Sequence, residues 1–111
     1  MWVWKRRVKF PPHCVQVFDP VMLQAGAEAG MIGNFHGDEL NPMLSGVLAE
    51  ETKSRAVSHL EHVSQRDIEA MARAHVFGVL LPTTAFVLRI KPPPARALID
   101  AGAHFCGSDA A

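Results

Sequence analysis

The stretch "MIGNFHGDEL", residues 31–40, decides the predicted fold, because a short apolar run is followed at once by three polar, titratable residues. A continuous apolar run of this length is typical of a buried strand in a parallel sheet. The residues after it are His36, Asp38 and Glu39, whose side chains can bind a metal or transfer a proton. The end of this strand is therefore the first candidate site.

Similar short apolar runs recur along the chain, with helix-forming segments between them. The further runs are "RAVS" (55–58), "VFGVLL" (76–81) and "AHFCG" (103–107), and the expected helices cover 20–30, 42–54, 65–75 and 95–101. Strands that alternate with helices predict a parallel sheet with right-handed crossovers. We therefore expect an α/β fold of about four parallel β/α units, with "CVQVF" (14–18) as a possible extra strand in front.

The helix boundaries carry recognisable signals. Two Asx-Pro pairs predict an N-cap followed by proline at the first helical position, and a serine three residues before an aspartate predicts a capping box. Glycines predict two of the helix ends. In chain order the signals are Asp19-Pro20, Gly30, Asn41-Pro42, Ser64 with Asp67, and Gly102.

Polar residues follow every predicted strand, at intervals of 23, 24 and 26 residues along the chain. They are His36, His59, Thr83 with Thr84, and Ser108 with Asp109. The carboxyl ends of parallel strands meet at one edge, where (β/α)₈ barrels and open α/β sheets build their sites. The repetition predicts that His36, His59 and Asp109 gather at one edge of the sheet.

His36 is the strongest candidate for a metal ligand, because Asp38 and Glu39 lie beside it and Asp109 follows an equivalent strand. A neutral imidazole and a carboxylate suit Zn²⁺ or Fe²⁺. Asp38 and Glu39 have an alternative role, since acidic side chains near the start of the next helix stabilise its dipole. For Glu39 this alternative and proton transfer both remain open.

The other histidines and threonines are weaker candidates. His59 is expected to face the same strand-end edge as His36, whereas His62 is expected to be structural or solvated. Thr83 and Thr84 follow a proline, so their hydroxyls suit either a cap on a turn or on the next element, or a substrate contact. The remaining histidines have no acidic or histidine neighbour at ligand spacing, and they are His13, His75 and His104.

The size and charge of the chain exclude several classes of protein. The 111 residues suffice for one small domain, and the formal net charge of zero argues against a dedicated nucleic-acid binder. Four basic residues fall within the first ten, so we expect residues 1–12 to form a basic leader and residues 13–111 to form the domain. Neither a secretory signal nor a membrane-spanning run of ~20 apolar residues is predicted.

The two cysteines, Cys14 and Cys106, are too few and too far apart to predict a disulfide framework, and the chain has no C-x-x-C motif. We expect both thiols to be reduced, as in a cytoplasmic protein.

Four segments together resemble imidazolonepropionases, amidohydrolase-superfamily enzymes of histidine degradation. The segments are "NFHGDELNPM" (34–43), "SHLEHVS" (58–64), "LLPTTAFVLRIKPPPAR" (80–96) and "GSD" (107–109), and the resemblance extends from about Val21 to Asp109. It implies a metal-dependent (β/α)₈ barrel that hydrolyses 4-imidazolone-5-propanoate to N-formimidoyl-L-glutamate. The implied partner is therefore a small-molecule substrate, and the implied cofactor is zinc or iron (Fe²⁺ or Fe³⁺).

The resemblance also implies a role for each candidate residue. His36 would be the metal ligand from the fifth barrel strand, and Glu39 would contact the substrate ring and move a proton. His59, after the sixth strand, would polarise the carbonyl under attack. Asp109, after the eighth strand, would bind the metal and accept a proton from water.

The family's first-strand H-x-H pair has no counterpart in this chain. A complete barrel needs ~200 residues or more, so we interpret the chain as a fragment with strands five to eight. Two alternatives remain. One is a non-catalytic half-barrel that binds metal weakly or assembles with itself or with a chain carrying the missing half. The other is a different amidohydrolase, related to the cytosine or guanine deaminases.

Overall fold

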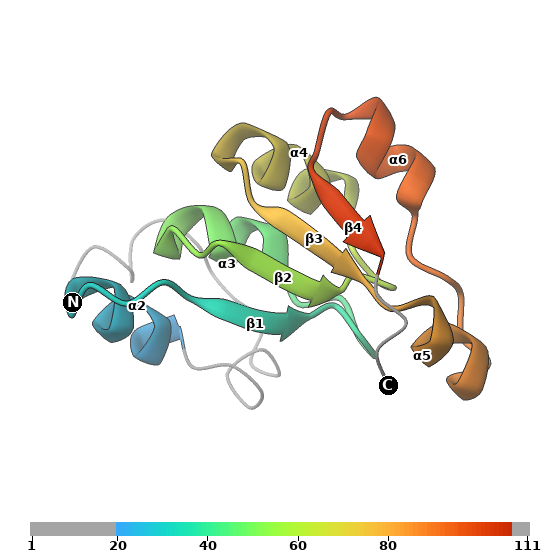
Figure 1. The fold of residues 1–111 in the computed structure, drawn as a ribbon, viewed down its shortest axis with the longest axis horizontal. Helices are drawn as coiled ribbons and strands as arrows, with labels where there is room; N and C mark the ends of the chain where they lie inside the picture. Colours follow the sequence, from blue (N-terminus) through green and yellow to red (C-terminus); the bar gives the residue numbers. More distant parts are fainter. Residues whose placement is uncertain (1–19, 108–111) are drawn as a thin grey trace.

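The computed structural model describes residues 20–107, and these form one four-stranded sheet with helices between the strands. The strands are β1 (Asn34–Gly37), β2 (Ala56–His59), β3 (Phe77–Leu80) and β4 (Phe105–Gly107). Every neighbouring pair is parallel, and the four arrows in Figure 1 point the same way. The predicted extra strand at 14–18, the basic leader, Cys14 and Asp109 lie outside the described residues.

The strand order is β1-β2-β3-β4, the same as the order along the chain. In a doubly wound sheet the order reverses at a switch point, whereas in a (β/α)₈ barrel each strand lies beside its predecessor. The helices are α2 (Pro20–Glu28), α3 (Ser45–Thr52), α4 (Gln65–Ala74), α5 (Pro82–Leu88) and α6 (Ala95–Asp100). The predicted α/β fold with four parallel strands is confirmed, and its order is that of a partial barrel.

The two faces of the sheet differ in burial. Phe35, Val57 and Leu80 are each at most 6 % exposed and belong to the core between the sheet and the helices. The rest of this core is Leu48, Ala49, Leu60, Ile68, Met71, Val76, Leu98 and Ala103. His36 lies on the opposite face and is exposed. In a closed barrel this second face lines the interior.

Each strand forms at the predicted place, with its two ends shifted by at most three residues. The prediction ended the first strand at Phe35, but β1 continues to Gly37, so His36 lies within the strand rather than after it. The reason is the pairing with β2, whose register sets His36 opposite Ser58 and Gly37 opposite His59. The neighbouring strand therefore extends β1 past its apolar run.

The predicted capping box opens α4. Ser64 Oγ accepts a hydrogen bond from the Asp67 backbone N–H at 3.2 Å, and the Asp67 carboxylate accepts one from the Ser64 N–H at 3.4 Å. The same carboxylate also accepts a hydrogen bond from the Val47 N–H at 3.1 Å, which ties α3 to α4. Gly30 and Gly102 follow α2 and α6 with φ values of 82° and 72°, as predicted for helix ends.

The predicted helix start at Asn41-Pro42 is wrong, because α3 begins at Ser45. Its N-cap residue Leu44 is left-handed (φ 57°) and has no side-chain cap. The Asp38 carboxylate instead accepts hydrogen bonds from the Met43 N–H and the Ser45 hydroxyl. This long-range cap holds the residues before Ser45 in a loop.

Helix α5 was not predicted, although a cap on a turn or on the next element was one of the two alternatives for Thr83 and Thr84. Pro82 occupies the start of the helix, where its missing N–H costs no hydrogen bond, and both threonines lie in the first turn. Phe86 is 85 % exposed and Val87 is 68 % exposed, so α5 shows no helical period of buried apolar residues. Figure 1 shows α5 near the tips of the strands, apart from α3 and α4. None of the described helices has the length and apolar character that a membrane crossing requires.

Candidate metal and catalytic site

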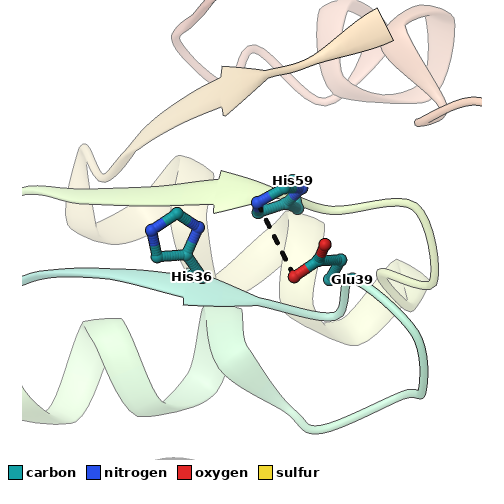
Figure 2. Close-up of side chains that lie close together, drawn as sticks. All are labelled: His36, Glu39 and His59. Carbon is teal, nitrogen blue, oxygen red and sulfur yellow. Dashed lines mark ion pairs between the residues drawn. The ribbon is translucent and has the colours of Figure 1, made fainter. Parts of the chain in front are cut away.

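The carboxyl ends of β1 and β2 bring two histidines together. His36 and His59 lie with their ring centroids 4.9 Å apart (Figure 2). Alternation along β2 would carry His59 to the same side as Val57, but its φ of 81° interrupts that alternation. His59 is buried, whereas His36 is exposed on the face that a closed barrel would turn inward. The predicted gathering of His36 and His59 at one strand-end edge is therefore confirmed.

Glu39 completes a cluster of three. It follows β1, and its Oε2 lies 3.7 Å from Nε2 of His59, with the Glu39 side chain 36 % exposed (Figure 2). One ligand atom from each of His36, Glu39 and His59 lies within 4.8 Å of the other two. A carboxylate that reaches the histidines in this way can act on a ligand held between them.

The donor set of this cluster fits a divalent metal. Two imidazoles and a carboxylate are the donors that zinc and non-haem iron use in proteins. The predicted ligand pair was His36 with Asp109, and Asp109 lies outside the described residues. Within residues 20–107, the groups that join His36 are Glu39 and His59, for which the family resemblance implied catalytic roles rather than metal binding.

Asp38 has the structural role that the sequence offered as its alternative. It is fully buried beside the start of α3, where it accepts from Met43 and Ser45. Burial raises the pKa of the Asp38 carboxyl to about 6, although the hydrogen bonds from Ser45 and Met43 oppose that rise. Asp38 therefore shapes the loop that carries Glu39.

Sequence reasoning missed Glu61. Its carboxylate is completely buried, and Oε1 lies 3.6 Å from Nδ1 of His59, on the other side of the ring from Glu39. The signal was present in "HLEH", where an acid stands two residues after the candidate histidine. His62, next in line, is half-buried and donates its backbone N–H to the Asp38 carbonyl at 2.8 Å.

Two hollows in the described surface differ in chemistry. A small pocket of about 130 Å³ is lined by residues 36–41 and Met43, and so includes His36 and Glu39. A larger one of about 630 Å³ lies along α5 and the proline-rich connector, lined mainly by apolar side chains and Arg89. We place the candidate site at the smaller hollow, because the His36 imidazole and the Glu39 carboxylate line it, whereas the larger one is built around exposed apolar residues.

Comparison with known proteins identifies the relatives of this chain. No protein-family model matches it. A probable imidazolonepropionase from Nematostella vectensis is 60% identical over 82 residues, which is 74% of this chain and 19% of the relative. Probable imidazolonepropionases from Dictyostelium discoideum and Homo sapiens are 54% and 51% identical, over 79% and 73% of the chain. The matched part of this chain is homologous to the imidazolonepropionases.

The resemblance to imidazolonepropionases found in the sequence is thus confirmed. The chain spans about a fifth of the length of these relatives, with 19% covered in Nematostella and 21% in Dictyostelium. The side chains to test are those that cluster at the strand ends, His36, Glu39 and His59.

Proposed function

We propose that this chain supplies the second half of the barrel of an imidazolonepropionase. Such an enzyme uses water to open the cyclic amide of 4-imidazolone-5-propanoate, giving N-formimidoyl-L-glutamate in histidine degradation. The observation that supports this best is the cluster of His36, Glu39 and His59 at the carboxyl ends of two neighbouring strands. That is the edge at which (β/α)₈ barrels carry out chemistry.

The proposal includes a divalent metal, zinc or iron, bound by His36 and by Asp109. A bound metal of this kind polarises a carbonyl and lowers the pKa of water toward ~7. Amide hydrolysis requires this help, because the carbonyl carbon of an amide is a poor electrophile. His36 suits this role because its exposed imidazole lies on the face that would line the barrel. Asp109 lies outside the described residues, and its part in this proposal rests on the family resemblance.

The remaining roles go to groups that surround this position. Glu39 contacts the substrate ring and moves a proton, and its partly exposed carboxylate is open to a ligand. His59 polarises the amide carbonyl through Nε2, the ring nitrogen nearer Glu39. Asp109 accepts the proton that the attacking water loses.

We further propose that activity requires the missing barrel half, from a longer chain or from a partner. Each of β1 and β4 has one neighbour among the described strands, so each offers a pairing edge. His36 also lies on a face that bulk water reaches, whereas amidase chemistry needs aligned groups shielded from it. The free, exposed thiol of Cys106 suits the reducing cytoplasm, where we place the protein.

A chimera tests this function directly. The 82 matched residues of the Nematostella relative are replaced by those of this chain, and ring opening of 4-imidazolone-5-propanoate is measured with added Zn²⁺ or Fe²⁺. If the parent turns over, the chimera should also turn over, and His36→Ala, Glu39→Gln and His59→Ala should each abolish most of the activity. The matched control is His104→Ala, because His104 is exposed and lies apart from the cluster, stacked on Phe77.

An inactive chimera from an active parent would contradict the proposal. If such a chimera still bound metal through His36, the alternative of a non-catalytic metal-binding half-barrel would replace it. Deamination of cytosine or guanine by the chimera would instead favour the deaminase alternative.

A further inference from the structure

Glu61 carries a buried carboxylate, and packing alone does not explain why a charged side chain lies there. Its side chain has no exposed surface, and neither carboxylate oxygen has a hydrogen-bond partner among the described residues. Burying a charge without a partner is costly, so such a group is expected to serve another group nearby. Nδ1 of His59 lies 3.6 Å from Oε1 of Glu61, and within residues 20–107 this nitrogen is likewise buried and without a hydrogen-bond partner.

The backbone between the two residues holds them face to face. His59 and Leu60 are both left-handed, with φ values of 81° and 69°, a conformation that is strained for residues other than glycine. Two hydrogen bonds hold this bend, from the Leu60 N–H to the Gly37 carbonyl (3.0 Å) and from the His62 N–H to the Asp38 carbonyl (2.8 Å). The bend returns the side chain of Glu61 to the ring of His59.

Packing supports the same bend. Leu60 is fully buried in the core, and its Cδ1 lies 3.0 Å from the position that a Cβ on Gly78 would occupy. Burial of the Leu60 side chain stabilises the bend and offsets part of the strain of its left-handed backbone. Strain that is held in place beside a candidate catalytic histidine points to function.

The two nitrogens of His59 face different surroundings. Nδ1 faces Glu61, which is sealed from solvent, whereas Nε2 faces Glu39, whose side chain is 36 % exposed. Nε2 is therefore the nitrogen that a substrate can reach, and Nδ1 is the nitrogen that the protein can hold. The tautomer and orientation of a histidine are set by the hydrogen bond that its other nitrogen makes.

We propose that Glu61 is a positioning residue for His59. Its carboxylate accepts a hydrogen bond from Nδ1–H and so fixes the ring with Nε2 turned to the substrate. A closure of roughly 0.5 Å brings the recorded separation into hydrogen-bond range, and such contacts are often long before substrate binds. The role of Nε2 toward a substrate rests on the proposed hydrolase function, whereas the pairing of Glu61 with Nδ1 does not.

NMR of the full 111-residue chain tests the pairing without any substrate. Long-range ¹H–¹⁵N correlations report which ring nitrogen of His59 carries a proton, and they are recorded at about pH 8, above the pKa of a free imidazole. We expect a protonated Nδ1 in the unchanged chain. A neutral ring with its proton on Nε2 and a bare Nδ1 would overturn the proposal, whatever the variants do.

The variant is Glu61→Leu, which keeps a similar volume and removes the acceptor. We expect the Nδ1 resonance of His59 to shift toward that of an unprotonated nitrogen, or to broaden until it is lost. The melting temperature should stay the same or rise, because an apolar group replaces a buried carboxylate. A lower melting temperature with an unchanged His59 resonance would show that Glu61 is merely structural. The control is Glu69→Leu, on the exposed side of α4.

The imidazolonepropionase chimera separates this inference from the proposed function. In an active chimera, Glu61→Leu should lower kcat by about 10–100-fold with little change in KM. An active chimera that is insensitive to the substitution overturns the positioning role. An inactive unsubstituted chimera rejects the hydrolase function, and the NMR result still decides the pairing.

Discussion

Replacing Asp38 by asparagine should change how the stability of the chain depends on pH. Asp38 is fully buried, and burial raises the pKa of its carboxyl to about 6, from an ordinary 3.8. An asparagine has nearly the same shape and does not titrate. Its amide can still accept from the Met43 N–H and donate to the Ser45 hydroxyl, the two groups that Asp38 contacts.

The size and sign follow from proton linkage. Because the pKa is raised in the folded state, that state keeps a proton over a pH range in which the unfolded chain has lost it. The contribution of Asp38 to stability is therefore fully present below about pH 3.8 and is lost as the pH rises to about 6. A shift of about two units corresponds to about 3 kcal/mol, at about 1.36 kcal/mol per unit.

Urea unfolding followed by circular dichroism, at several values from about pH 4 to about pH 7, measures this effect. We expect the unfolding free energy of Asp38→Asn minus that of the unchanged chain to rise by roughly 2–3 kcal/mol across this range. The histidines titrate in both proteins, so their contributions largely cancel. Asp100→Asn, at an exposed position near the end of α6, controls for the loss of one carboxylate. A difference that is independent of pH, or that falls as pH rises, would refute the reasoning.

Three further predictions concern packing, surface charge and metal. Gly46→Ala should destabilise the chain by about 1–3 kcal/mol in thermal unfolding, because the new Cβ would lie 2.4 Å from the Asp67 carbonyl oxygen where α3 crosses α4. An unchanged melting temperature would show that the two helices can move apart at no cost. Arg73→Met should leave the melting temperature nearly unchanged and should have no effect in high salt, because the paired Arg73 and Glu50 side chains, 3.1 Å apart, lie in contact with solvent. A clear loss of stability that persists in high salt would contradict this. Zn²⁺ affinity, measured by calorimetry, should fall roughly tenfold or more for His36→Ala and stay unchanged for His104→Ala. Equal effects of the two substitutions would show that the metal does not bind at the cluster of His36, Glu39 and His59.

The fold could be predicted from the sequence because its signals are local. Apolar runs, the Ser64–Asp67 capping box and the glycines after α2 and α6 all act within a few residues, and each was found at or near its predicted place. The start of α3 could not be predicted, because Asp38 caps it from seven residues before Ser45, through a loop. Helix α5 was missed because its apolar residues are exposed, which leaves no buried stripe to detect.

The candidate site could be predicted only in part, because some of its contacts depend on loop conformations that no local sequence signal reveals. Strand-end polar residues pointed to His36 and His59, since parallel strands align their ends whatever the details of packing. The pairing of His59 with Glu61 depends on two consecutive left-handed residues, and no residue in "HLEH" signals them. Glu39 lies near His59 because the loop after β1 folds back, which Asp38 controls through Met43 and Ser45.

The central claim is that this chain carries half of an imidazolonepropionase site and needs the other half to work. Turnover of 4-imidazolone-5-propanoate is measured with added Zn²⁺ or Fe²⁺, first for the purified 111-residue chain and then for its mixture with the first-half barrel of the Nematostella relative. We predict no measurable ring opening by the chain alone, because it lacks the first-strand H-x-H pair and the wall that excludes water. The mixture should be active and should lose its activity with Asp109→Asn. Robust turnover by the chain alone, abolished by Asp109→Asn, would contradict the account.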